Sequence, residues 1–221
     1  GALTTAGHVT TTGANVTFTR AVTLTGNVIF QAGGGNITFS STLDGGNNLT
    51  INAGSGNATF GGALGNTLAL NALTITASTI TANSTLSAAS VTLAGGAVDL
   101  NGAVTAPGGF TSTGSAFDNT GAAITTSNSA ITINHTANVI IGGALNAGSG
   151  NVDIDAGGTL VLNAPITTSS GFVTLDATGT TTASSNGYIY STSGTVTFGA
   201  TKNGALTTAG HVTTTGANVT F

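Results

Sequence analysis

Residues 1–18 of this 221-residue chain read GALTTAGHVTTTGANVTF, and the same eighteen residues recur unchanged at 204–221. The two copies lie 203 positions apart, and an unbroken match of this length does not arise by chance. We therefore predict a tandem organisation with a period of 203. Residues 1–203 form one solenoid repeat block, and residues 204–221 begin the next, identical block.

A shorter period of 21 residues runs outward from the end of this segment. Val16 and Phe18 flank Thr17, so the two apolar side chains lie on one face of a strand and the threonine on the other. Apolar residues recur every 21 positions in three interleaved ladders, which predicts three short strands per coil. The ladders are Val16, Phe18, Ile37, Phe39, Ala58 and Phe60; Val22, Leu43 and Leu64; Val28, Leu49 and Leu70; and, downstream, Ile131, Val152 and Val173.

This pattern predicts an all-β chain folded as a right-handed parallel β-helix (β-solenoid) of about ten coils, each of about 20–21 residues. Stacked coils place each apolar side chain over its equivalent and pair the strands in parallel, about 4.8 Å apart. The right hand is expected because parallel crossovers almost always have it. A β-sandwich gives no reason for one residue class to recur every 21 positions, whereas the coils of a solenoid pack only on their neighbours.

Asparagines precede the first strand of several coils and predict a ladder at the corner. They are Asn15, Asn36, Asn57 and Asn151. Asparagine tolerates left-handed backbone and can hydrogen-bond to an identical amide in the next coil. We therefore expect these side chains to turn inward and to stack amide on amide.

Charged residues make up only 4% of the chain, against about 25% in ordinary domains. Arg20 and Lys202 are the only cations, too few to form a nucleic-acid-binding surface. The sequence contains no run of 18 apolar residues, so it does not predict a membrane-spanning helix. The absence of cysteine excludes disulfides and thiolate metal sites. A net charge of −4 with 39% hydrophobic residues favours an ordered chain over a disordered one.

The sequence shows no nucleophile elbow and no phosphate-binding glycine motif, so we expect neither an enzyme nor a cofactor. Asp155 and Asp176 are 21 residues apart and could share a proton, bind Ca²⁺ or resemble a glycosidase pair. Asn134 precedes them in the same register, which favours a polar corner ladder over a metal or catalytic site. The histidines, among them His135, are expected at the surface or in turns.

Three segments resemble very large bacterial surface proteins made of β-strand repeats and related to filamentous haemagglutinin-type adhesins. They are NNLTINAGSGNATFGGALG (47–65), GGFTSTGSAFDNTGAAITTSNSAITINHTANVIIGGALNAGSGNVDI (108–154) and GGTLVLNAPI (157–166). The resemblance implies a parallel β-helix shaft that is secreted and displayed outside the cell. The family brings no catalytic residues.

A solenoid without a capping element exposes strand edges and an apolar core, and here the end of the chain repeats its beginning instead. We therefore expect the chain's partner to be itself, end to end and by lateral association, in an extracellular fibre or sheath. The shaft of a secreted adhesin for surface or biofilm attachment is the alternative. An ice-binding solenoid, suggested by the outward threonines, is a more remote one.

Overall fold

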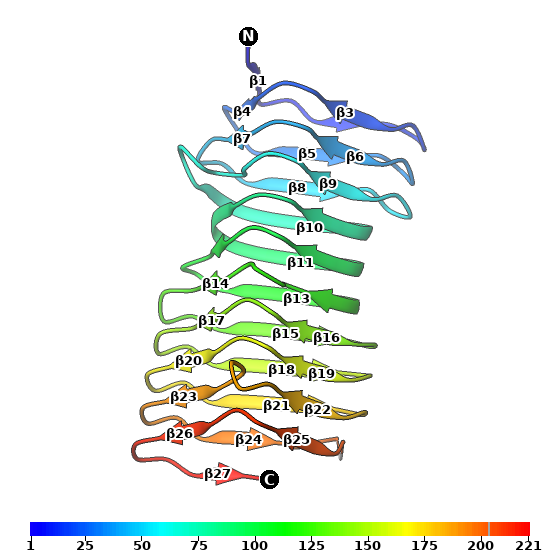
Figure 1. The fold of residues 1–221 in the computed structure, drawn as a ribbon. Helices are drawn as coiled ribbons and strands as arrows, with labels where there is room; N and C mark the ends of the chain where they lie inside the picture. Colours follow the sequence, from blue (N-terminus) through cyan, green and yellow to red (C-terminus); the bar gives the residue numbers. More distant parts are fainter. Residues whose placement is uncertain (203) are drawn as a thin grey trace. The chain divides into compact units, whose positions relative to one another are not determined.

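The computed structural model describes residues 1–202 and 204–221 and shows a β-solenoid. Its strands pair in parallel from coil to coil, about ten coils are present, and no helix occurs among the described residues. Two compact units, Gly1–Ala106 and Pro107–Phe221, divide the chain. Within each unit the strands lie over one another in successive coils (Figure 1).

Unit 1 begins with coils of three short strands, which form three parallel ladders. The ladders are β1 (Leu3–Thr5), β4 (Val22–Leu24) and β7 (Leu43–Asp44); β2 (Val9–Thr10), β5 (Val28–Gln31) and β8 (Leu49–Asn52); and β3 (Val16–Phe18), β6 (Ile37–Phe39) and β9 (Ala58–Phe60). Further along, β10 (Leu70–Ala82) pairs with both β8 and β9 and is followed by β11 (Leu86–Leu100) and β12 (Val104–Thr105). In the region where the 21-residue spacing becomes irregular, the long strands β10 and β11 thus take the place of two or more short strands per coil.

Unit 2 begins with one long strand and then returns to coils of three strands. Its strands are β13 (Phe110–Asp118), β14 (Ile124–Thr125), β15 (Ile131–His135), β16 (Val139–Ile141), β17 (Leu145–Asn146), β18 (Val152–Ala156), β19 (Leu160–Leu162), β20 (Ile166–Thr168), β21 (Val173–Ala177), β22 (Thr181–Ala183), β23 (Ile189–Ser191), β24 (Val196–Phe198), β25 (Leu206–Thr208), β26 (Val212–Thr214) and β27 (Val219–Thr220). From β14 onward each strand pairs with the third strand after it, so every coil repeats the one before.

The core consists of side chains stacked directly over their equivalents. Phe18, Phe39 and Phe60 share one register, with ring centroids 4.8 and 5.6 Å apart and nearly parallel planes. Phe30 meets the stack edge-on, at 5.0 Å from Phe18 and 5.4 Å from Phe39. Aromatic pairs in these geometries add about 0.5–1.5 kcal/mol each beyond their burial. The alternation of apolar and polar residues therefore points the phenylalanines into the core, where each ring stacks on its equivalent in the next coil.

The expected place of Leu70 in the third ladder is wrong. Leu49 pairs with Leu73, and Leu70 pairs instead with Ala88. The extra residues lie in the segment 65–69, where the Asp44 carboxylate accepts a hydrogen bond of 2.8 Å from the backbone N–H of Thr67. Because of this loop, the residue that pairs with Leu49 comes three positions later than expected. Leu70 is nevertheless buried.

The corner asparagines form a ladder, but not by stacking amide on amide. The side-chain oxygen of Asn15 accepts the backbone N–H of Asn36 at 2.8 Å, and that of Asn36 accepts the backbone N–H of Asn57 at 2.9 Å. Asn151 binds the backbone N–H of Phe172 in the same way. The four asparagines are exposed rather than turned inward, because their oxygens satisfy backbone donors at the outer edge of the corner.

Candidate functional site

The two copies of the duplicated segment pair with different neighbours. The first copy, residues 1–18, pairs with the coil that follows it, through β1 with β4, β2 with β5, and β3 with β6. The second copy, residues 204–221, pairs with the coil that precedes it, through β25 with β22, β26 with β23, and β27 with β24. One sequence thus pairs along either edge of its strands.

The two pairings use different backbone groups of the same sequence. In the first copy the N–H groups of Leu3, Thr11 and Val16 donate to the next coil. The residues of the second copy that match those positions are Leu206, Thr214 and Val219, and the hydrogen bonds to the preceding coil involve other groups. These are the carbonyls of Ala205, His211 and Asn218 and the N–H groups of Gly204, Ala209 and Thr215. A single segment therefore has the groups to pair on both edges at once.

Two turn hydrogen bonds recur in both copies of the segment. Thr5 Oγ1 accepts the N–H of Gly7 at 3.1 Å, and Thr208 Oγ1 accepts the N–H of Gly210 at 3.1 Å. The following corner is closed by Thr11 Oγ1, which donates to the Ala14 carbonyl at 2.7 Å, and by Thr214 Oγ1, which donates to Ala217 at 2.6 Å. The copies differ elsewhere, because Gly13 has a φ of 98° whereas its copy Gly216 does not adopt a positive φ.

Hydroxyl groups close further corners of unit 2 in the same way, and the apolar pattern of the sequence does not predict them. Thr126, Thr168 and Ser191 are buried, and each donates to the carbonyl three residues later. The signal was present, because Thr or Ser precedes Ser or Gly by three positions at each of these corners. These bonds satisfy carbonyls that a tight corner leaves without a strand partner.

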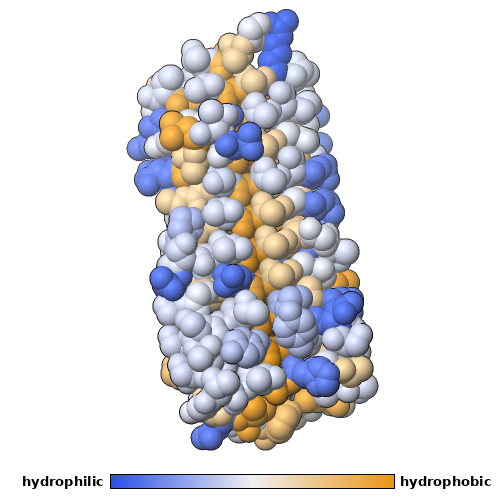
Figure 2. Space-filling model, turned by 60° about the vertical axis from the view of Figure 1, so that its left-hand side comes forward, coloured by the Kyte–Doolittle hydropathy of each residue, from blue (hydrophilic) through white to orange (hydrophobic). Residues whose placement is uncertain are grey.

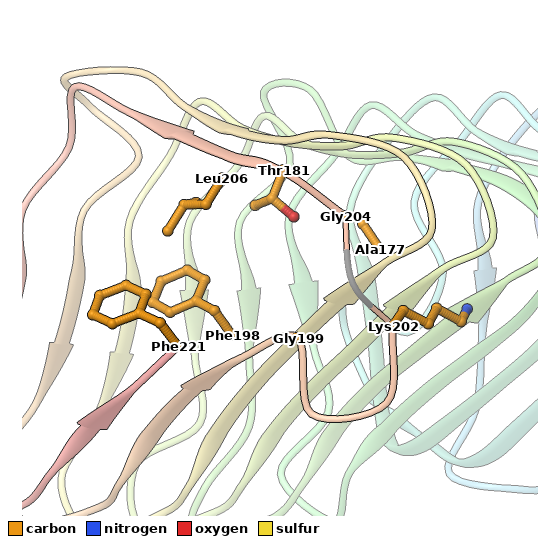
Figure 3. Close-up of a pocket in the computed structure, with 8 residues that line it drawn as sticks. All are labelled: Ala177, Thr181, Phe198, Gly199, Lys202, Gly204, Leu206 and Phe221. Carbon is orange, nitrogen blue, oxygen red and sulfur yellow. The ribbon is translucent and has the colours of Figure 1, made fainter.

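Phe221, the last residue of the second copy, lies beside a hollow lined by apolar side chains. Phe221 is 80% exposed and stacks on Phe198, with ring centroids 5.4 Å apart and planes 8° apart. A hollow of about 270 Å³ lies next to the two rings, with Leu206 and Thr181 on its opposite side (Figure 3). Phe221 is the copy of Phe18, which stacks on Phe39 in unit 1. The same ring therefore stacks on the preceding coil in one copy and on the following coil in the other.

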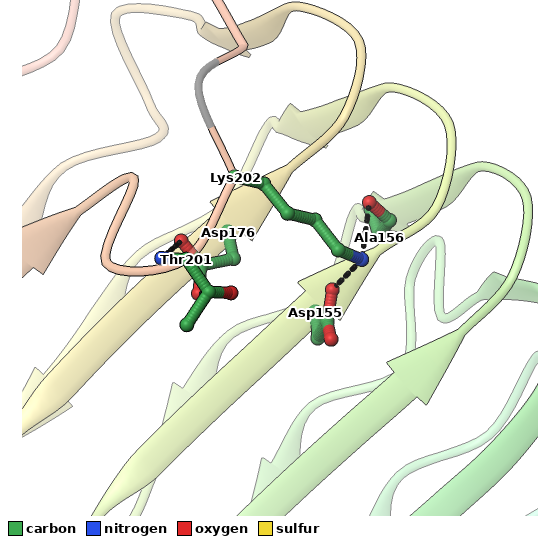
Figure 4. A network of polar contacts seen from close by, with 5 residues as sticks. All are labelled: Asp155, Ala156, Asp176, Thr201 and Lys202. Carbon is green, nitrogen blue, oxygen red and sulfur yellow. Dashed lines mark hydrogen bonds and ion pairs between the residues drawn. The ribbon is translucent and has the colours of Figure 1, made fainter.

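Asp155 and Asp176 lie in register on β18 and β21, as their spacing predicted, with Asn134 before them. The Lys202 ammonium pairs with Asp155 and donates to the Ala156 carbonyl at 3.2 Å (Figure 4). Asp176 accepts two hydrogen bonds from Thr201, at 3.2 and 3.0 Å. Sequence reasoning missed both partners, because the loop after β24 that brings them over these strands has no counterpart in the preceding coils.

The acidic cluster of Asp153, Asp155 and Asp176 is contacted by Thr201 and Lys202, which follow β24. Lys202 forms an ion pair with Asp155, and Thr201 donates a hydrogen bond to the carboxylate of Asp176. In the described part of the chain, no group of three or more His, Cys, Asp or Glu side chains is placed to bind a metal ion. The third acid, Asp153, faces outward on β18. Its partial burial and the neighbouring carboxylates of Asp155 and Asp176 raise the pKa of Asp153. The arrangement stabilises the loop after β24 against the outer face of the coils.

The expectation of a surface position is wrong for His135, which is fully buried. Its Nε2 lies 3.0 Å from Ser112 Oγ and its ring 5.5 Å from that of Phe117, while Nδ1 has no hydrogen-bond partner among the described residues. In register it lies between Gly114 and Ala156, whose small size leaves room for the imidazole. Burial lowers the pKa of His135 to about 4. Alternation from Ile131 and Ile133 would have placed residue 135 inward.

The face of the molecule drawn in Figure 2 shows no continuous charged area. On the face shown in Figure 2, strongly hydrophilic residues occur as scattered spots rather than as a continuous area. Among the described residues, no helix has the length and apolar character needed to cross a membrane. Comparison with family models, curated proteins and solved structures gave no match to this chain.

Proposed function

We propose that this chain is a segment of an extracellular bacterial fibre or sheath, built from tandem β-solenoid blocks that continue into one another. Its role is structural rather than catalytic. The observation that carries the proposal is the behaviour of the duplicated segment. The same eighteen residues pair with the following coil in one copy and with the preceding coil in the other, through different backbone groups.

A repeated block needs such a segment at its joint. When one copy pairs on both edges, the coil of β22–β24 leads through it into the coil of β4–β6 of the next block. The aromatic stack then runs from Phe198 through the shared phenylalanine to Phe39 and Phe60. At about 4.8 Å per coil, a block of about ten coils advances the fibre by about 48 Å.

The composition supports a role outside the cell, where a fibre meets proteases and changing salt. Trypsin-like proteases have two target residues in the chain, Arg20 and Lys202, and the Lys202 side chain is held by Asp155. Few charges remain for salt or pH to act on. The resemblance to large bacterial surface proteins supports the same location.

The outward threonines support a fibre more than an ice-binding surface. Thr17, Thr38, Thr59 and Thr81 stack in unit 1, but Asp99 takes the next position in that register. In unit 2 the corresponding kind of row is interrupted by Asp153. Threonine is also a good β-branched residue for any exposed strand, which accounts for the row without a ligand.

Chains of one, two and three blocks test the proposal. Electron microscopy should show rods that lengthen by about 48 Å with each added block, and aligned fibres should diffract on the meridian near 4.8 Å. These fibres should resist trypsin as intact rods. Separate globules joined by flexible links, or fibres without the meridional reflection, would contradict the proposal.

A further inference from the structure

We infer that the side chains of Lys202 and Asp155 become joined by an amide bond, which the folded chain forms by itself with the loss of one water. The bond links Nζ of Lys202 to Cγ of Asp155. It ties the loop after β24 to β18, two coils earlier, as a covalent clamp within unit 2. The inference concerns chemistry inside one chain and does not rest on the proposed fibre.

The two reacting groups already lie in contact. The Lys202 ammonium forms an ion pair with Oδ1 of Asp155, and its Nζ also donates to the Ala156 carbonyl at 3.2 Å (Figure 4). This second bond holds the nitrogen beside the Asp155 side chain, and the one N–H that an amide keeps can continue to make it. Lys202 is the only lysine of the chain, so no other side-chain amine competes for the carboxylate.

A separate set of bonds holds the loop that carries Lys202. Asp176 is buried, lies in register with Asp155 one coil later, and accepts the N–H and the hydroxyl of Thr201 at 3.2 and 3.0 Å. Because Thr201 directly precedes Lys202, these bonds restrict where the ammonium can lie. Well-oriented groups within one molecule react as if present at about 10⁵–10⁸ M. This favours a condensation that a separate ammonium and carboxylate do not undergo in water.

The neighbouring Asp153 offers a path for the protons. It faces outward on β18, as does Asp155 two residues later. Partial burial and the carboxylates of Asp155 and Asp176 raise the pKa of Asp153, so it takes up a proton more readily than an isolated aspartate. A carboxyl group of this kind can accept a proton from nitrogen and return it to oxygen within one reaction.

The reaction needs no further reagent. One proton of the Lys202 ammonium passes to the Asp155 carboxylate, and the neutral amine then attacks Cγ to form the C–N bond. A second proton passes from nitrogen through Asp153 to the hydroxyl oxygen, and the C–O bond breaks. The water leaves into the hollow of about 410 Å³ that Asp153 and Asp155 line. The third hydrogen stays on the amide nitrogen, and one positive and one negative charge are lost together.

The mass of the chain tests the inference directly. Intact-mass spectrometry of the denatured full chain should give a value lower than the sequence mass by one water. A reagent that acylates amines should add one group, at the N-terminus, rather than two. A wild-type chain that is folded by circular dichroism, keeps its full mass and takes up two acyl groups overturns the inference.

The matched control is Lys202→Arg, which keeps the positive charge but has no amine to form the bond. It should show its full sequence mass, and a water loss that persists in this variant overturns the inference by placing the change elsewhere. Peptide mapping of the wild type locates the bond. Chymotrypsin cleaves the denatured chain after Phe172 and Phe198, so the fragments that carry Asp155 and Lys202 should remain joined, and separate fragments contradict the bond.

The rate of bond formation tests the part of Asp153. Chains from cell-free synthesis start with the ion pair alone, and their mass can be followed over time. Asp153→Asn should form the bond about 10²-fold or more slowly than the wild type, because an amide cannot carry the proton. Asp99→Asn, on a strand of unit 1, is the control and should react at the wild-type rate. Equal rates for Asp153→Asn and the wild type overturn the proton path.

Discussion

Acidification should destabilise unit 2 through His135, whose imidazole is buried and has one nitrogen without a partner among the described residues. Burial lowers the pKa of His135 from 6.5 to about 4 in the folded state. Between these two values the unfolded chain binds a proton that the folded chain does not. The contribution of His135 to the free energy of unfolding is therefore fully present above about pH 6.5, decreases as the pH falls to about 4, and levels off below that value.

The size of the effect follows from the shift. A pKa difference of about 2.5 units at about 1.4 kcal/mol per unit corresponds to about 3.5 kcal/mol in total, of which about 3 kcal/mol is lost between pH 7 and pH 4. Asp153 acts in the opposite direction, because its raised pKa lets the folded state take up a proton more readily than the unfolded state. The effect of His135 must therefore be measured as a difference between two proteins that both retain Asp153.

The matched variant is His135→Gln, which keeps a polar side chain but cannot titrate in this range. Urea unfolding followed by circular dichroism at pH 7, 5.5 and 4 should show the wild type losing about 3 kcal/mol more than the variant. An NMR titration of the imidazole gives the folded-state pKa directly. A His135 resonance that titrates near 6.5, or equal pH dependence in the two proteins, would refute the reasoning.

Three further substitutions, two of them with a control variant, test the aromatic core, the Lys202–Asp155 ion pair and the glycine corners by urea unfolding. Phe39→Ala should cost about 3–5 kcal/mol, because it removes the central ring of a buried stack, whereas Ile29→Ala at an exposed position should stay within about 0.5 kcal/mol; equal costs would contradict the stacked core. Relative to chains that carry only the ion pair, Lys202→Met should lower the free energy of unfolding by less than about 1 kcal/mol, since the side chains of Lys202 and Asp155 are 27% and 30% exposed. A loss of several kcal/mol would contradict this and would show that the ion pair contributes strongly to the stability of the coils. Gly150→Ala should cost about 1–3 kcal/mol, because its Cβ would lie 2.1 Å from the Ser129 carbonyl oxygen, while Gly216→Ala meets nothing within 4 Å and should be neutral.

The fold could be predicted from the sequence because a solenoid repeats one local rule. Val16, Ile37 and Ala58 keep a spacing of 21 and are stacked in the structure, so alternation and period together fixed the register. The rule failed where the coil length changes. At Leu70 an outward loop held by Asp44 shifts the strand, and nothing in the apolar pattern shows whether extra residues enter the strand or leave it.

The site features were harder to predict because they depend on contacts between distant residues. Lys202 meets Asp155 across 47 residues, through a loop that interrupts the period. The asparagine ladder was predicted in position but not in bonding, because sequence alone does not show whether an amide oxygen meets another amide or a backbone N–H. The two-sided pairing of the duplicated segment also required the structure, since the repeat alone shows that the sequence recurs but not which groups bond in each copy.

The scarcity of charge follows from the same stacking that builds the core. A charged residue that recurs once per coil would lie about 4.8 Å from its equivalents, where two like charges repel by about 1 kcal/mol even in water. Asp155 over Asp176 is the case in which this stacking occurs, and there a lysine and a threonine from a separate loop bind the two carboxylates. Uncharged Thr, Asn and Ser repeat without that repulsion, and Asn even gains a bond to the next coil. A long stack of near-identical coils therefore favours a nearly uncharged composition on physical grounds.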